Sequence, residues 1–193
     1  MIKRRKWTTM DLAVMGLLVA LNIIASKYLA LKIGDLIRLN FSSAFIMLSG
    51  IWLGPIGGAL VGLVSDLLGC VMANYGINPL YTLMPVMIGV ISGLCEPIFK
   101  KHRNPFAYGG VILIMTLVTS VIYGTWALTT WDIIIGKLPW MGAKEYVFLL
   151  IANGSSRLVQ GLVTTVMNTM VVYLLYRSYV TIMLTSIRAN NKK

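Results

Sequence analysis

Long apolar blocks limit the folds open to this chain more than any other feature of its sequence. Apolar residues make up 58% of the 193 residues and charged residues only 12%, about half the charged share of a soluble domain. Because a membrane-spanning helix needs about 20 mostly apolar residues, this length accommodates six of them with short loops. We predict an all-α, six-transmembrane-helix protein forming a single membrane-embedded domain (1–193). The blocks expected to be helical are 8–28, 41–53, 56–72, 81–99, 106–129 and 145–176.

The positions of Lys and Arg predict how the helices are oriented. The N-terminal segment, the segment 100–103 and the tail after Tyr176 hold 4, 3 and 4 of the 17 cations. Cytoplasmic loops of membrane proteins are enriched in these residues, so we expect both termini to be cytoplasmic. The net charge of +11 then reflects topology in a cell membrane and not binding to nucleic acid. The loops at 29–40, 73–80 and 130–144 are expected to face outside.

Several classes of function are disfavoured by what the chain contains. No large soluble domain fits, and no phosphate-binding glycine loop occurs, which excludes a self-contained ATPase. Cys70 and Cys95 lie within apolar runs and are expected to act as packing residues. The acids are scattered and the lone His102 lies in a cationic segment, so we predict no catalytic site, no metal and no cofactor.

The stretch 37–81 combines a cationic entrance with a tight turn. Arg38 precedes one apolar run, and Gly54-Pro55 separates that run from the next. This turn is too short for anything except a close antiparallel helix pair. Lys27, Lys32 and Arg38 together would make a positive entrance on the outer side. Arg38 either anchors the chain at lipid headgroups or holds a carboxylate through its two-pronged guanidinium.

Two ionisable residues, Asp66 and Arg157, lie well inside predicted helices. Charges within a membrane face a partner or a cavity, because leaving them unpaired costs several kcal/mol. They could pair with each other as a structural bridge. Alternatively, Arg157 meets the negative charge of a ligand, while Asp66 orients a loop or accepts hydrogen bonds from N–H groups of the ligand.

The last helix carries a polar stripe at spacings of three and four residues, which must face inward in lipid. Asn153, Arg157 and Gln160 lie near the outer end and are candidates for binding. For Thr164 and Asn168, closer to the cytoplasm, we expect hydrogen bonds between helices. Asn40 and Asn78, at the ends of the outer loops, are further candidates for polar contacts with a ligand.

Aromatic side chains gather toward the predicted outer face. Most Trp and Tyr residues at membrane interfaces are anchors. Tyr75, in a polar loop, and Trp126, about one turn below the outer end of its helix, are the two that we expect to contact a ligand. Flat rings beside cations suit a ligand that is both aromatic and anionic.

Three stretches of the sequence resemble the substrate-binding subunits, or S components, of energy-coupling factor (ECF) vitamin transporters. They are Arg38–Phe41 (RLNF), Ile51–Pro55 (IWLGP) and Gly62–Gly69 (GLVSDLLG). Within that group the chain resembles the folate family along nearly its whole length. The resemblance implies a subunit that captures a vitamin outside and topples in the membrane on a transmembrane coupling subunit with two cytoplasmic ATPases. No catalytic activity is implied.

The first predicted helix carries a face of small residues that could dock on the coupling subunit. Ala13, Gly16 and Ala20 share one helix face, and small residues on one face let a neighbouring helix come close. The family usually has Ala-x-x-x-Ala there and docks this face on the coupling subunit. The present chain has Gly16 in the first position, and exchanging one small residue for another keeps the close approach.

The implied ligand is folate, whose glutamate carboxylates would suit Arg38, Lys27 or Arg157 and whose rings would suit Trp126 and Tyr75. Alternatives are an S component for another vitamin, such as pantothenate or a pyridoxine-related compound, and a self-sufficient small transporter, which would need a continuous path. A lipid-modifying enzyme would need clustered acids or histidine. The predicted substrate-binding residues are Lys27, Arg38, Asn40, Asp66, Tyr75, Asn78, Trp126, Asn153, Arg157 and Gln160.

Overall fold

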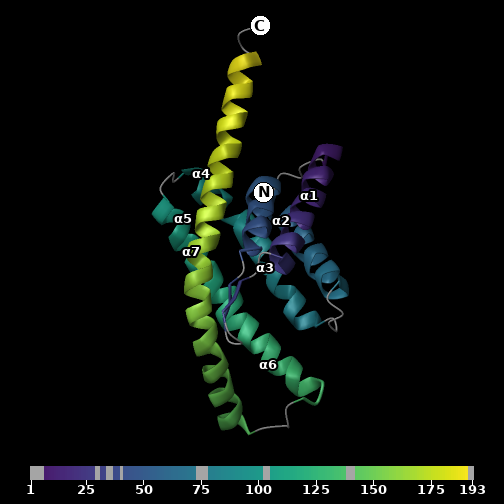
Figure 1. Cartoon of the computed structure of the whole chain (residues 1–193), viewed down its shortest axis with the longest axis vertical. Helices are drawn as coiled ribbons and strands as arrows, with labels where there is room; N and C mark the ends of the chain where they lie inside the picture. Colours follow the sequence, from purple (N-terminus) through teal and green to yellow (C-terminus); the bar gives the residue numbers. More distant parts are fainter. Residues whose placement is uncertain are drawn as a thin grey trace.

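The computed structural model describes residues 7–28, 31–33, 37–39, 41–72, 78–101, 105–137 and 142–190, with the backbone alone for 31–33, 37–39, 100–101, 105, 143, 156 and 179–190. The chain forms a helical bundle in which one very long helix extends beyond the others (Figure 1). Its elements are α1 (Thr9–Tyr28), β1 (Leu31–Ile33), β2 (Ile37–Leu39), α2 (Ser43–Met72), α3 (Pro79–Leu94), α4 (Glu96–Lys101), α5 (Pro105–Thr116), the π-helical η1 (Leu117–Tyr123), α6 (Gly124–Ile134) and α7 (Ala143–Asn190).

All six predicted helical blocks are helical, and the first begins where its sequence indicates. The Thr8 hydroxyl accepts a hydrogen bond from the backbone N–H of Asp11 (3.3 Å), and the Asp11 carboxylate accepts one from the backbone N–H of Thr8 (3.0 Å). This reciprocal pair satisfies two N–H groups that a helix start leaves without partners. The end of α1 at Tyr28 also agrees with the prediction.

The predicted turn at Gly54-Pro55 is confirmed. Gly54 has φ 83° and ψ 178°, so the helical path of α2 breaks there. Eight residues in an unbroken helix span about 12 Å. A Cβ placed on Gly58 would instead lie 2.8 Å from the Cα of Gly50, so the two halves of α2 lie side by side. The halves correspond to the predicted helices 41–53 and 56–72.

The helical fold that we predicted is confirmed, and a short hairpin that we did not predict interrupts it. Strands β1 and β2 pair antiparallel, with Leu31 opposite Leu39 and Ile33 opposite Ile37. Three residues a strand are too few for an alternating pattern to stand out in the sequence. The hairpin lies in the loop that we expected to face outside, and β2 contacts α7.

The predicted fifth and sixth helices are longer than expected. Segments α5, η1 and α6 follow one another without a break and continue to Ile134, so Trp131 and Asp132 lie in a helix and not in a loop. Helix α7 has 48 residues, about 72 Å of helix. The predicted fourth helix ends earlier, because Cys95 separates α3 from α4.

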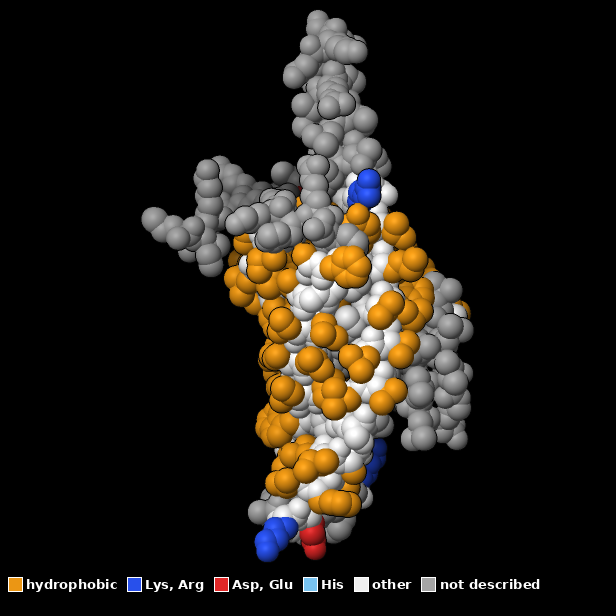
Figure 2. Space-filling model, turned by 90° about the vertical axis from the view of Figure 1, so that its left-hand side faces the viewer, with side chains coloured by type: hydrophobic (Ala, Val, Ile, Leu, Met, Phe, Trp, Pro, Cys, Tyr) orange, Lys and Arg blue, Asp and Glu red, His pale blue; other side chains and the backbone are white. Residues whose placement is uncertain are grey.

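The exterior of the bundle suits lipid. Four helical segments, 9–28, 43–72, 106–134 and 144–178, are long and apolar enough to cross a membrane, and α3 is a shorter apolar helix. On the face in Figure 2, hydrophobic side chains cover the middle, and the visible charged side chains among the described residues lie toward its ends. Such a wide exposed apolar surface is expected where lipid replaces water.

The interior has two apolar clusters. One joins the first half of α2 to α3, α5 and α7 through fully buried side chains such as Leu48, Ile112 and Val172. The other packs α1 against α2 through Leu18, Val19 and Val61. Both leave room for a polar region between the helices, which forms the candidate site.

Candidate functional site

Three adjoining cavities lie between the helices in the described part of the chain. The large lobe, about 450 Å³, lies between α1, α2 and α3 and reaches Leu128 and Gln160. The small lobe, about 150 Å³, lies between α2, α3, the α5–η1 segment and α7. The side lobe, about 230 Å³, lies between α6 and α7. Gln160 lines both the large and small lobes, and Arg157 lines both the small and side lobes, so the three form one composite cavity.

Charged and amide side chains line the large lobe. Lys27 comes from the last turn of α1, Asp66 from the second half of α2, and Asn78 from the start of α3. The Asp66 carboxylate accepts a 2.7 Å hydrogen bond from the Thr82 hydroxyl, which fixes its position against α3. A second carboxylate oxygen remains to accept N–H or O–H groups from an occupant.

Two residues of this lobe also position its walls. The Asn78 side chain caps α3 by accepting a 3.0 Å hydrogen bond from the backbone N–H of Tyr81. Asn22, buried on α1, donates to the carbonyl of Ser42 (2.8 Å) and so ties α1 to the start of α2. Asn78 therefore has a structural role in addition to its place in the cavity lining.

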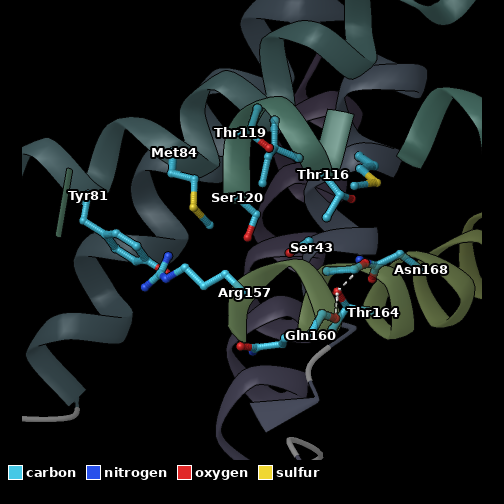
Figure 3. Close-up of a pocket in the computed structure, with 13 residues that line it drawn as sticks. Ser43, Tyr81, Met84, Thr116, Thr119, Ser120, Arg157, Gln160, Thr164 and Asn168 are labelled. Atoms are coloured by element: carbon cyan, nitrogen blue, oxygen red, sulfur yellow. Dashed lines mark hydrogen bonds between the residues drawn. The ribbon is translucent and has the colours of Figure 1, made fainter. Parts of the chain in front are cut away.

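Arg157 is the charged residue in the lining of the small lobe (Figure 3). Its side chain extends along the cavity beside Tyr81 and Met84. A Cβ on Gly124 would lie 3.0 Å from its Nη1, so the absence of a side chain at Gly124 makes room for the guanidinium. Within the described part of the chain, Arg157 makes no hydrogen bond or ion pair. A charge held inside a membrane bundle without a protein partner points to an anionic occupant.

The alternative of a bridge between Asp66 and Arg157 is not realised. Asp66 is bonded to Thr82, and the two charged residues line different lobes. The hydrogen bonds between helices expected of Thr164 and Asn168 are also absent. Thr164 donates to the carbonyl of Gln160 within its own helix (2.8 Å), and Asn168 makes no hydrogen bond to another described residue.

Polar atoms without partners lie in the walls of all three lobes. Four residues of the lining are buried and have a side-chain oxygen that makes no hydrogen bond to another described residue: Ser65 in the large lobe, Thr125 and Thr129 in the side lobe and Asn168 in the small lobe. Buried polar groups are normally satisfied, because leaving them unsatisfied costs about 1–3 kcal/mol each. Their distribution indicates a cavity built to hold a polar occupant.

Six of the ten predicted binding residues line the composite cavity: Lys27, Asp66, Asn78, Asn153, Arg157 and Gln160. Trp126 is not among the lining residues; it is 42% exposed and its ring packs against Tyr123, with 5.8 Å between the centroids. Asn40, Tyr75 and the Arg38 side chain lie outside the described residues. The structure therefore assembles the charged part of the predicted site but not Trp126.

Sequence reasoning missed several lining residues. Tyr81 is the only aromatic side chain among the described residues of the lining, and Thr82 fixes Asp66. Thr116, Thr119 and Ser120 line the small lobe from the α5–η1 segment. Their spacing of three residues and one residue does not mark a single face of an α-helix. The π-helical turn changes the direction of the side chains, so the spacing offered only a weak indication that all three face the cavity.

The predicted docking residues of α1 form a surface of their own. Ala13, Gly16 and Ala20 are all exposed on one face of the helix. A Cβ on Gly16 would meet nothing within 4 Å. In the described structure this face has no helix packed closely against it.

No group of three or more His, Cys, Asp or Glu side chains arranged to hold a metal occurs in the described residues. The fold and cavity define a membrane-embedded helical protein with a polar cavity that contains a cationic side chain, Arg157. The sequence matches the family described as "ECF transporter, substrate-specific component" over residues 10–176, and the chain belongs to this family. Members of this family are substrate-binding subunits of transporters and not enzymes, and the family implies a vitamin substrate and a coupling module with ATPases.

Solved structures give the same fold. The crystal structure of FolT bound with folic acid is 20% identical, with a TM-score of 0.57 over 84% of this chain and 94% of that one. The S component of a bacterial ECF transporter is 18% identical, with a TM-score of 0.59 over 90% of this chain and 97% of that one. At these identities the likeness concerns the fold. No curated protein matches the sequence significantly.

Proposed function

We propose that this chain is the S component that captures folate from outside the cell and delivers it inward. In this proposal the six helical blocks cross the cell membrane with both termini cytoplasmic. The loaded subunit topples on a transmembrane coupling subunit driven by two cytoplasmic ATPases. The observation that carries the ligand assignment is Arg157, a guanidinium in a polar cavity that makes no hydrogen bond or ion pair with another described residue. The fold shared with FolT bound with folic acid supports it.

The chemistry of the cavity supports roles for individual residues. Arg157 would hold a glutamate carboxylate of folate, with Lys27 adding positive charge at the large lobe. Asp66, fixed by Thr82, would accept hydrogen bonds from N–H groups of the ligand. Asn153 and Gln160 would contribute amide contacts. Arg38, Asn40, Tyr75 and Trp126 remain predicted contacts on the evidence of the sequence.

The direct test starts from the purified full-length protein in detergent. Mass spectrometry identifies any small molecule that co-purifies, and folate is titrated while Trp fluorescence is followed. We expect saturable quenching by micromolar folate or below. No quenching at micromolar folate, together with a different co-purified molecule, would reject the ligand assignment.

Arg157→Ala should weaken folate binding tenfold or more, because a charge-assisted hydrogen bond is worth about 1.5–3 kcal/mol. Arg177→Ala is the matched control, since Arg177 lies on the same helix, outside the cavity lining, and donates to the hydroxyl of Tyr173 (3.1 Å). That variant should bind like wild type. If Arg157→Ala destabilises the protein but binds folate normally, Arg157 has a structural role only.

A second ligand deserves the same titration. The described lining contains one aromatic side chain, Tyr81, but many hydroxyl and amide groups. This composition also suits an anion that carries hydroxyl and amide groups of its own, such as pantothenate. Quenching or thermal stabilisation by pantothenate but not by folate would shift the assignment within the same family.

A further inference from the structure

Asn168 marks the inner end of the small lobe. It is the lining residue of α7 closest to the C-terminus, and only 3% of it is exposed. Its Oδ1 atom has no hydrogen-bond donor among the described residues. A buried amide oxygen requires a donor, so a group outside the described protein atoms is needed to complete this site.

Two of the hydroxyls that line the small lobe are committed within their own helices. Thr164 donates its proton to the carbonyl of Gln160 (2.8 Å), and Thr119 donates to the carbonyl of Met115 (2.7 Å). Their oxygens keep lone pairs that can accept a hydrogen bond. Asn168 offers an acceptor, Oδ1, and N–H donors on Nδ2, and it makes no hydrogen bond to another described residue. This part of the lobe therefore suits an occupant whose group both donates and accepts hydrogen bonds, such as a hydroxyl or an amide.

Asn168 and Arg157 belong to one continuous track along α7. Eleven residues separate them, which is almost a whole number of turns and places both on one helix face, about 16 Å apart along the axis. One turn beyond Asn168, the fully buried Val172 belongs to the apolar cluster that also contains Met47, a lining residue of the lobe. The track thus adjoins the side lobe at Arg157 and is bounded by apolar side chains just past Asn168.

We propose that Asn168, with Thr164 and Thr119 of the same lobe, forms an inner subsite that binds a hydroxyl or amide group of the same ligand whose anionic group meets Arg157. This inference rests on the proposed ligand-binding function. It specifies an elongated ligand with a negative group at one position and a hydroxyl or amide group deeper in the bundle. Such a subsite would reject analogues of equal size that carry an apolar group there.

The test compares Asn168→Leu, which keeps the size of the side chain but removes its polar atoms, with Thr169→Val. Thr169 is the adjacent residue, lies outside the lobe and donates to the carbonyl of Thr165 (2.7 Å). With folate and pantothenate as separate probes, Asn168→Leu should lose at least tenfold in affinity for the one that wild type binds, and Thr169→Val less than twofold. Thr164→Val removes one acceptor from the same subsite and should lose about threefold in affinity. It replaces Asn168→Leu as the test variant if Asn168→Leu does not fold.

Three outcomes separate the claims. If Asn168→Leu binds like wild type and melts at a higher temperature, its oxygen meets only water and the subsite is rejected. If wild type binds neither probe but co-purifies with another anion, the folate proposal fails. The amount of that anion bound to Asn168→Leu is then measured by mass spectrometry. A lower amount than in wild type supports the subsite, and an equal amount rejects it. If wild type holds no small molecule at all, both the proposed function and the subsite are rejected.

Discussion

Two sets of small residues in this bundle have opposite environments. Where α2 meets α3, a Cβ on Gly89 would overlap the carbonyl group of Gly58, and one on Gly62 would overlap the backbone of Pro85. On α1, a Cβ on Gly16 would meet nothing within 4 Å, and Ala13 and Ala20 beside it are exposed. Small residues allow backbones to approach closely in lipid, but among the described residues only the first set has a helix packed against it.

The difference shows what a stripe of small residues can predict. The stripe on α1 and the glycines of α2 have similar spacing in the sequence, so spacing indicates a close approach without naming the partner. The α2–α3 glycines are used within the fold and hold three helical segments together around the cavity. No described helix packs closely against the α1 face, and under the proposed function the coupling subunit would dock there.

The largest effect is expected from Gly89→Ala. The added methyl group would meet the backbone of Gly58, which cannot move aside as a flexible side chain can. We expect a loss of about 3 kcal/mol of stability or more, seen as early melting and aggregation in detergent. Gly110→Ala is the control, because a Cβ there meets nothing within 4 Å. Equal melting temperatures for the two variants would mean that the close packing is not needed.

A smaller loss is expected from Gly54→Ala. The backbone at Gly54 has φ 83° and ψ 178°, a region that residues with a side chain rarely adopt, although space for a Cβ exists there. The strain should cost about 1–3 kcal/mol. Thermal melting in detergent measures it, again beside Gly110→Ala. An unchanged melting temperature would show that the reversal in α2 does not depend on this conformation.

The smallest effect on stability is expected from Gly16→Leu, because its side chain would enter open space. Melting temperature and ligand affinity should match wild type. Uptake of the ligand by cells that contain the whole transporter should fall at least tenfold, since the bulky side chain keeps the coupling subunit at a distance. Gly110→Leu is the matched control and should leave uptake unchanged. Normal uptake with Gly16→Leu would remove this face from the docking surface.

Much of the fold could be predicted from the sequence, because the dominant signals are local. Apolar block length identified the helices, and Gly54-Pro55 identified the reversal within α2. The β1–β2 hairpin was missed because its strands have three residues each. The π-helical η1 segment was missed because its apolar sequence is compatible with an α-helix, and only the packing of neighbouring helices distinguishes the two.

The site was partly predictable for the same reason. An ionisable residue within an apolar block stands out, so Asp66 and Arg157 could be named from the sequence. Thr82 and Asn168 resemble the many polar residues that bond within their own helix, and their roles depend on which atoms lie opposite them. Trp126 was singled out because aromatic residues suit a ring-containing ligand, but its ring lies beside Tyr123 and outside the cavity lining.

The sequence by itself determined that this chain enters a membrane, where its helices lie along the chain and which charges they carry inward. These properties follow from the cost of exposing backbone and charge to lipid, which acts on each segment separately. Only the tertiary structure decided that Asp66 bonds to Thr82 instead of Arg157, and that Asn168 is left without a donor. Hydrogen bonds require partners within about 3 Å, and the packing of helices far apart in sequence determines which groups come that close.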